Sequence, residues 1–169
     1  MQEQDFPSLY RSADDLSLKS QKHFFQALRI HLVLLVIAAT LSIISIPHWL
    51  VALAQLLALL GALGCSIYLF SVRPDRMWYS GRAVAESIKT VTWRYVCRAE
   101  PFQTENLIAK NDFRQTLKQI IEQNREVCES LTEHLDGEQF TQVMEQLRSQ
   151  SLEERKATYT NACLKDQLP

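Results

Sequence analysis

The dominant feature of the hydrophobic pattern is one apolar block that extends from Leu32 to Val72 and contains no Lys, Arg, Asp or Glu. His48 is its only ionisable side chain of note. At ~1.5 Å per residue, a continuous helix of this length would measure roughly 60 Å, about twice the ~30 Å thickness of a bilayer's hydrocarbon core. The block is therefore too long for a single transmembrane helix.

The middle of the block carries a turn signal, Ser45-Ile46-Pro47-His48-Trp49. Proline breaks a helix, and Trp is typical of a membrane–water interface. We therefore predict two spans, at about 29–46 and 49–72, with a turn at 47–48. The alternative, a helical pair buried inside a soluble core, is disfavoured because the flanks hold too few apolar stripes to surround two helices that are apolar on every side.

Basic residues flank the block on both sides and are missing from the turn. They predict that both termini lie in the cytoplasm, with the chain in the plasma (inner) membrane. The predicted fold is all-α. Residues 1–28 form an N-terminal cytoplasmic helix, residues 29–72 a transmembrane hairpin and residues 73–169 a cytoplasmic helical region. The basic residues used for this orientation are Lys19, Lys22, Arg29, Arg73, Arg76 and Arg82.

Helical periodicity subdivides the cytoplasmic region into helices at about 76–99, 105–134 and 141–165. The helices at 76–99 and 105–134 each carry a stripe of apolar residues at helical spacing, which we expect to pack against the rest of the protein. Ser151 and Glu154 form a capping box at the start of a last helix. The two stripes consist of Val84, Ile88, Val91 and Tyr95, and of Phe113, Leu117, Ile120, Ile121, Val127 and Leu131.

A second stripe on the 76–99 helix combines charge with an aromatic ring; its members are Arg82, Glu86, Lys89 and Trp93. Opposite charges one turn apart can pair on a solvated helix face, which is the simplest interpretation. Aromatic and Arg side chains are also dense around it, at Trp78, Tyr79 and Arg94. Because contact surfaces are enriched in these residue types, the stripe is also a candidate for coupling to a partner.

The spans contain two sets of candidate residues. Small residues recur every fourth position at Ala54, Ala58, Ala62 and Ser66, a spacing that allows close helix packing, either within the hairpin or between copies. Polar side chains lie at Gln55, Thr40, Ser42 and Ser45. At this depth they face a partner helix or line a pore.

Composition excludes several classes of function. The formal net charge of −1 argues against non-specific nucleic-acid binding, which needs excess Lys and Arg. Only four glycines occur, and they cannot build a P-loop or a dinucleotide fingerprint. The four cysteines are widely spaced, and neither His31 nor His48 has a metal-ligand partner one turn away. We expect no catalytic residue, no cofactor, no metal site and no enzymatic activity.

Three segments carry a resemblance to a known family. The central one comprises Trp78-Tyr79, Arg82-Ala83, Ala85-Glu86-Ser87, Lys89-Thr90, Trp93-Arg94-Tyr95 and Arg98-Ala99-Glu100-Pro101-Phe102. The outer ones comprise Leu9-Tyr10, Ala13-Asp14, Ser17 and Gln21, and Glu154-Arg155-Lys156-Ala157 with Tyr159 and Asp166-Gln167. Together they resemble the SLATT family, bacterial two-span effectors associated with SMODS nucleotidyltransferases and SLOG sensors, and most closely its third subgroup. Cys163 stands where the resemblance leads us to expect a basic residue.

The resemblance implies an effector of a bacterial anti-phage or other conflict system, activated by a nucleotide signal. It further implies homo-oligomers that form a pore or disrupt the bilayer and so cause cell arrest or death. The expected partners are the lipid bilayer, copies of the same chain and a nucleotidyltransferase or nucleotide sensor. The alternative is a non-conducting membrane anchor or scaffold that docks a soluble partner through its cytoplasmic helices.

Overall fold

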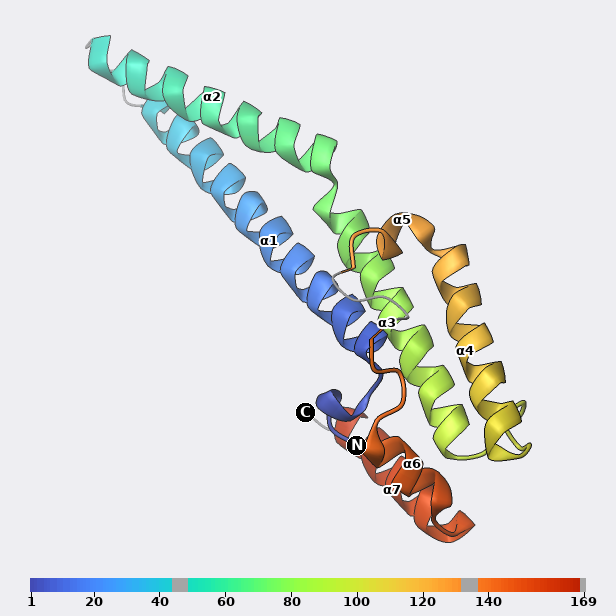
Figure 1. Cartoon of the computed structure of the whole chain (residues 1–169). Coiled ribbons are helices and arrows are strands. Elements are labelled where there is room, and N and C mark those ends of the chain that lie inside the picture. Colours follow the sequence, from blue (N-terminus) through green and yellow to red (C-terminus); the bar gives the residue numbers. More distant parts are fainter. Residues whose placement is uncertain (44–48, 132–136, 168–169) are drawn as a thin grey trace. The chain divides into compact units, whose positions relative to one another are not determined.

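The structure is a computed structural model, and it describes residues 1–43, 49–131 and 137–167. All regular elements among these residues are helices (Figure 1). The all-α prediction is therefore confirmed. After a short 3-10 helix, η1 (Glu3–Asp5), the chain forms α1 (Ser8–Ile43), α2 (Trp49–Val72), α3 (Pro74–Val96), α4 (Asn106–Gln123), α5 (Arg125–Cys128), α6 (Gln142–Ser149) and α7 (Leu152–Gln167).

The chain divides into two compact units. The apolar unit consists of Leu18–Trp78, and the polar unit of Met1–Ser17 with Tyr79–Pro169. Helices α1 and α3 each contribute residues to both units. The predicted turn at 47–48 lies outside the described residues, as does Ser45.

Within the apolar unit, α1 and α2 pack along a seam of buried and half-buried positions that share one side of each helix. The seam positions recur three or four residues apart, a spacing expected of two helices that cross at a shallow angle. His31 Nδ1 donates a hydrogen bond to the backbone carbonyl of Ala62 at 3.0 Å, so a polar contact joins the helices as well. The seam comprises Phe24, Ala27, His31, Leu34, Ala38 and Leu41 on α1, and Val51, Gln55, Ala58, Ala62, Cys65 and Leu69 on α2.

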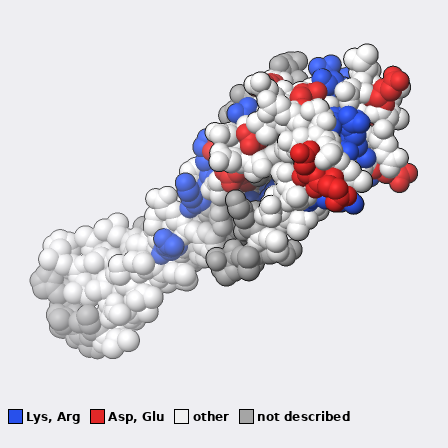
Figure 2. Space-filling model, turned by 90° about the horizontal axis from the view of Figure 1, so that it is seen from below, with Lys and Arg blue, Asp and Glu red and all other residues white. Residues whose placement is uncertain are grey.

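Outside the seam, the two helices expose large apolar side chains. Both are long and apolar enough to cross a membrane, and only 11% of the most apolar stretch of each is buried. A core helix of a soluble protein would be mostly buried, so this exposure supports a membrane protein. Figure 2 shows one region of the surface without Lys, Arg, Asp or Glu side chains, and the sequence of α2 and of α1 from Leu32 onwards contains none of these residues.

The core of the polar unit is built from the predicted stripe of α3. Val84, Ile88, Val91 and Tyr95 are all buried, which confirms this stripe. They pack in one cluster with the N-terminal segment and with residues of α4, α5 and α6. The members contributed by those segments include Phe6, Leu9, Phe113, Leu117, Val127, Met144 and Leu147.

Where the sequence predicts one helix over 105–134, the structure has α4 and α5. They are separated at Asn124, whose side chain Nδ2 donates to the Ile120 carbonyl at 2.9 Å. Asn competes in this way with the backbone's own helical hydrogen bonds, which explains the interruption. The stripe itself persists across the break, because Phe113, Leu117 and Val127 are all buried.

Two predicted helix starts are present as expected. Thr141 caps α6 by accepting a hydrogen bond from the Met144 backbone amide at 3.3 Å. Before α7, the Ser151 amide donates to Glu154 Oε2 at 3.0 Å, and the Glu154 amide donates to Ser151 Oγ at 3.4 Å. This reciprocal pair confirms the capping box. The Ser151 hydroxyl also donates to Glu154 Oε2 at 2.8 Å, and this bond, together with the bond from the Ser151 amide, lowers the pKa of the Glu154 carboxyl.

Candidate functional site

A pocket between α3 and α7 brings together much of the charged stripe and the last helix. Its volume is about 410 Å³. We call it the α3–α7 pocket; it lies entirely within the polar unit. Its lining consists of Glu86, Lys89, Thr90, Trp93, Arg94, Cys97, Ala99, Tyr159, Ala162 and Cys163. Three of the four members of the charged stripe therefore line one cavity.

Trp93 connects this pocket to the core. Its ring meets Phe6 edge-on with centroids 6.1 Å apart, and Tyr159 edge-on at 5.4 Å. Trp93 is only 9% exposed, whereas Tyr159 is 45% exposed. The pocket wall thus contains two aromatic rings, the buried ring of Trp93 on α3 and the more exposed ring of Tyr159 on α7.

Two members of the charged stripe form the ion pair that its helical spacing predicts. Arg82 lies 2.8 Å from Glu86 Oε1, one turn away, and 3.2 Å from Asp14 Oδ1 on α1. Such exposed pairs contribute little to stability, so their main effect is to orient side chains. Arg94 is held differently, because its Nε and Nη2 both donate to the Glu100 carbonyl, at 2.9 and 2.5 Å. Lys89 and Arg94 place two cations in the pocket lining beside the Glu86 carboxylate.

Two cysteines lie at one end of the pocket. Burial raises the pKa of the Cys97 thiol, and the neighbouring Cys163 raises it further, while Arg155 opposes them. A hydrogen bond with Cys163 raises the pKa of Tyr159. Arg155 itself donates from Nη1 to the Cys97 carbonyl at 2.8 Å, which ties α7 to the end of α3. The Cys97 thiol is therefore in its neutral form at physiological pH and contributes an apolar surface to the pocket lining there.

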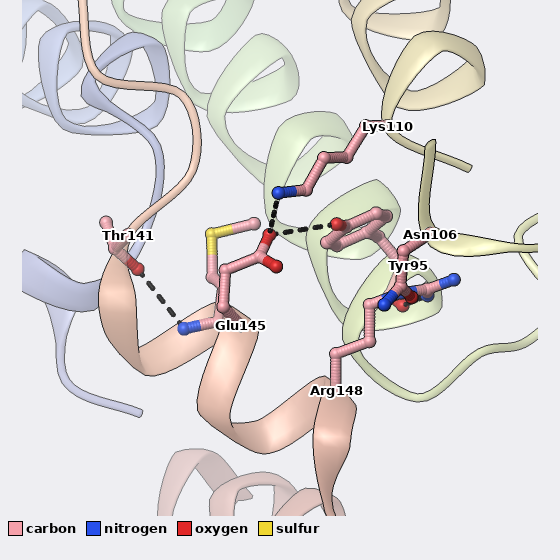
Figure 3. A network of polar contacts seen from close by, with 7 residues as sticks. Tyr95, Asn106, Lys110, Thr141, Glu145 and Arg148 are labelled. Atoms are coloured by element: carbon pink, nitrogen blue, oxygen red, sulfur yellow. Dashed lines mark hydrogen bonds and ion pairs between the residues drawn. The ribbon is translucent and has the colours of Figure 1, made fainter. Parts of the chain in front are cut away.

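The end of α3 and the segment after it are held by Arg148, whose guanidinium is fully buried (Figure 3). It donates to the backbone carbonyls of Tyr95, Phe102 and Thr104 and, through Nε, to Asn106 Oδ1 at 3.1 Å. Burial lowers the pKa of Arg148. Because a buried guanidinium needs most of its donors satisfied, this arrangement fixes residues 95–106 around one side chain.

A second polar link joins α3, α4 and α6 (Figure 3). The Tyr95 hydroxyl donates to Glu145 Oε1 at 3.1 Å, and Lys110 Nζ lies 3.2 Å from the same oxygen. Burial raises the pKa of Tyr95, and the charge of Glu145 raises it further. Together with Arg148, this link makes α3 a rigid support for the α3–α7 pocket.

The structure places the candidate residues of the spans on different faces. Gln55, Ser66, Ala58 and Ala62 are buried or half-buried on the side of α2 that forms the seam, whereas Ala54 is exposed. Thr40 and Ser42 are also exposed, and Thr40 Oγ1 donates to the Ile37 carbonyl of its own helix at 2.8 Å.

Two further candidates of α3, Trp78 and Tyr79, are not among the residues that line the α3–α7 pocket. Tyr79 is 65% exposed. Trp78 is half-buried in the apolar unit, where its ring lies 6.3 Å from Phe24 and 5.6 Å from Phe25, measured between centroids.

Sequence reasoning did not identify the partners that complete the site. Arg148 and Arg155 sit on amphipathic helices where an Arg is ordinarily solvated, and nothing in their spacing indicates burial. The i, i+4 spacing of Tyr159 and Cys163 is a weak signal that both occupy one face of α7. Within the described residues, no group of three or more His, Cys, Asp or Glu side chains is placed to hold a metal ion.

Comparison with known proteins identifies a family. Residues 7–156 match the family described as "SMODS and SLOG-associating 2TM effector domain 3". No curated protein matches the chain, and no solved structure matches it either.

Proposed function

The chain belongs to the SMODS and SLOG-associating 2TM effector domain 3 family, and from this premise we propose that it is a membrane effector of a bacterial nucleotide-signalled conflict system. The match covers most of the chain, from the residue before α1 to the second turn of α7. The observation that carries the proposal is the combination of this match with two exposed apolar helices.

In the proposed arrangement, α2 and the second half of α1 cross the inner membrane as a hairpin with both chain termini in the cytoplasm. Their large apolar side chains outside the seam, such as Phe70 at 86% exposure, are then covered by lipid. Burying them in hydrocarbon removes the cost of their contact with water. The basic residues on both sides of the apolar block support the cytoplasmic assignment.

The proposed action is a leak formed when several hairpins associate, because a single pair of helices encloses no channel. Gln55 lies on the seam side of α2, which supports a role between the two helices of one hairpin. Thr40 and Ser42 lie on exposed positions and remain the better candidates for a conducting path. Symmetric association of identical copies is the usual form of such assemblies.

We place reception of the signal at the α3–α7 pocket. It combines cations from Lys89 and Arg94 with the rings of Trp93 and Tyr159, a mixture typical of contact surfaces. A nucleotidyltransferase or nucleotide sensor is the proposed source of the signal. Helix α3 continues from the pocket to Pro74, next to the end of α2 in sequence, so a change at the pocket acts on a helix that reaches the proposed membrane segment.

Induced expression in cells loaded with a membrane-potential dye tests the effector function. We expect depolarisation and growth arrest when the signalling partner is co-expressed. Ala62→Leu should reduce this response, because Ala62 is 3% exposed in the seam and a larger side chain separates α1 from α2. Ala52→Leu, on the exposed side of the same helix, is the matched control. Unchanged potential and growth with the partner present, at normal levels of protein in the membrane fraction, would contradict the proposal.

A second candidate function, a non-conducting anchor, is favoured by the accessible ring of Tyr159 in the pocket. For an anchor, Tyr159→Ala releases the soluble partner, and wild-type protein never changes the membrane potential. For an effector, Tyr159→Ala lowers the signalled depolarisation. Leu152→Ala, at an exposed position of α7 outside the pocket lining, controls for the loss of an apolar side chain. Trp93→Ala is a poorer probe, because Trp93 belongs to the core.

A further inference from the structure

One face of α1 changes from basic and aromatic to purely apolar along its length. Lys22, Phe25, Arg29, Val33 and Val36 recur three or four residues apart and therefore share this face. All five are exposed, Val33 and Val36 by 57% and 63%. The face lies opposite the seam, because seam residues such as His31 and Leu34 occupy the other side of the helical period. It is therefore available to a ligand.

The basic end of this face forms a groove of about 650 Å³. We call it the basic groove; it is lined by Gln21, Lys22, Phe25, Gln26, Arg29 and Ile30. Lys22 and Arg29 are seven residues apart, which is about 10.5 Å along a helix. Arg29 is also the last charged residue before Arg73, so it marks the edge of the apolar block.

The ring of Phe25 is part of an aromatic cluster at the same level. Its centroid lies 5.6 Å from that of Trp78 and 5.4 Å from that of Phe24. Aromatic rings concentrate at the boundary between the hydrocarbon core and the headgroups of a bilayer. The groove thus combines two cations with the aromatic residues expected at that depth.

Charge separates strongly between the two units. The apolar unit contains five basic residues, namely Lys19, Lys22, Arg29, Arg73 and Arg76, and Asp75 is its only acid. The polar unit contains the other acids and carries a net negative charge. An anionic ligand is therefore attracted to the apolar unit rather than to the molecule as a whole.

We propose that the basic groove binds the phosphate headgroup of an anionic phospholipid, an inference that rests on the proposed insertion of α1 into the membrane. The phosphate is held between Lys22 and Arg29, and an acyl chain follows the apolar continuation at Ile30 and Val33. A soluble anion would use the cations but gain nothing from this apolar continuation. The continuity of basic and apolar surface on one helix face is what selects a lipid.

The test uses delipidated full-length protein in detergent, titrated with phosphatidylglycerol or with phosphatidylcholine of the same acyl chains. Bound lipid is counted by native mass spectrometry. We expect roughly 25-fold tighter binding of phosphatidylglycerol, because each basic residue near an anionic headgroup contributes a factor of roughly five. The preference should shrink as ionic strength rises.

Three variants assign the preference to the groove. Lys22→Gln with Arg29→Gln should abolish most of it, whereas the charge-preserving exchange Lys22→Arg with Arg29→Lys should retain it. Lys118→Gln with Arg125→Gln removes the same charge from exposed sites in the polar unit and should leave it unchanged.

Equal affinity for the two lipids, or a preference that survives Lys22→Gln with Arg29→Gln, would overturn the proposal. Complete displacement of phosphatidylglycerol by inorganic phosphate at the same concentration would also overturn it, in favour of a soluble anion. Extraction of cell membranes with alkaline carbonate distinguishes a failure of the groove proposal from a failure of the proposed membrane function. Protein that stays in the membrane but shows no lipid preference refutes the groove alone, and protein that is extracted refutes the membrane insertion itself.

Discussion

Arg148 donates a hydrogen bond from Nη1 to the backbone carbonyl of Tyr95, and its guanidinium carbon lies 4.4 Å from the centroid of the Tyr95 ring. One cation from α6 is thus paired with the backbone and the π face of one residue on α3. Nη2 donates to the carbonyls of Phe102 and Thr104, and Nε donates to Asn106 Oδ1. The charge is compensated mainly by backbone dipoles and an aromatic face rather than by a contacting carboxylate.

Removing this guanidinium should destabilise the polar unit. Arg148→Met keeps the apolar stem but leaves buried carbonyls without donors, and we expect a loss of about 2–4 kcal/mol. Arg148→Lys should recover only part of this, because an ammonium group cannot match the fork geometry. Thermal unfolding in detergent, followed by near-UV circular dichroism, measures the effect. Arg125→Met, at a highly exposed site, should change stability by less than about 0.5 kcal/mol; equal losses at both sites would contradict the role of Arg148.

The contrast between Val84 and Arg148 shows how much of the fold the sequence could predict. Helical periodicity correctly predicted that Val84 and Ile88 belong to the core. Apolar residues three and four positions apart lie on the same side of a helix, so they are buried together. Arg148 is more deeply buried than many apolar residues, yet its burial depends on carbonyls from residues 95–104, which only the tertiary structure brings together. Similarly, the break at Asn124 depends on a side-chain hydrogen bond that periodicity does not report.

Tyr10 should make the polar unit sensitive to alkaline pH. Burial and the neighbouring Asp14 raise the pKa of Tyr10 to about 12 from its usual 10. The folded state therefore holds this proton more tightly, and the resulting stability is complete below about pH 10 and is lost as pH rises towards 12. In this window each such tyrosine lowers the free energy of unfolding by up to about 1.4 kcal/mol per pH unit.

The measurement is the unfolding midpoint as a function of pH, with tyrosinate absorbance recorded in parallel. Tyr10→Phe preserves the ring beside Phe6, whose centroid lies 4.8 Å away, and removes the titrating hydroxyl. We expect a shallower decline between pH 10 and 12 in this variant. An identical decline in both proteins would show that another group dominates.

For the candidate site, the sequence indicated one wall of the pocket but not the other. Glu86, Lys89 and Trp93 stood out because charged and aromatic residues repeat at helical spacing on one helix. The opposite wall, with Tyr159 and Cys163, comes from a helix about seventy residues further along the chain, and a single sequence does not report which surface that helix meets. The burial of Trp93 follows from the same packing, since its ring is covered by Phe6 and Tyr159.

Gly81 lies where α3 packs against Ser17 of α1 within the polar unit. A methyl group built on Gly81 would lie 3.4 Å from the backbone nitrogen and Cα of Ser17. Gly81→Ala should therefore be tolerated, whereas Gly81→Leu should cost about 1–3 kcal/mol by forcing the helices apart. Thermal unfolding measures both, and Ala83→Leu, at an exposed position of α3, is the control for added bulk. A harmless Gly81→Leu would show that α1 and α3 separate freely at this point.

Thiol reactivity reports directly on the α3–α7 pocket. Since burial raises the pKa of both Cys97 and Cys128, little thiolate forms at pH 7.5, and both should react with iodoacetamide more slowly than an unstructured thiol. Filling the pocket with Ala162→Phe should slow the alkylation of both Cys97 and Cys163, because it covers them, and should leave that of Cys128, which is outside the lining, unchanged. Peptide mass spectrometry after timed alkylation gives each rate, and Ala83→Phe controls for a new ring on exposed helix surface. If Ala162→Phe left Cys97 and Cys163 as reactive as before, the two thiols would not share the cavity that the proposed coupling role requires.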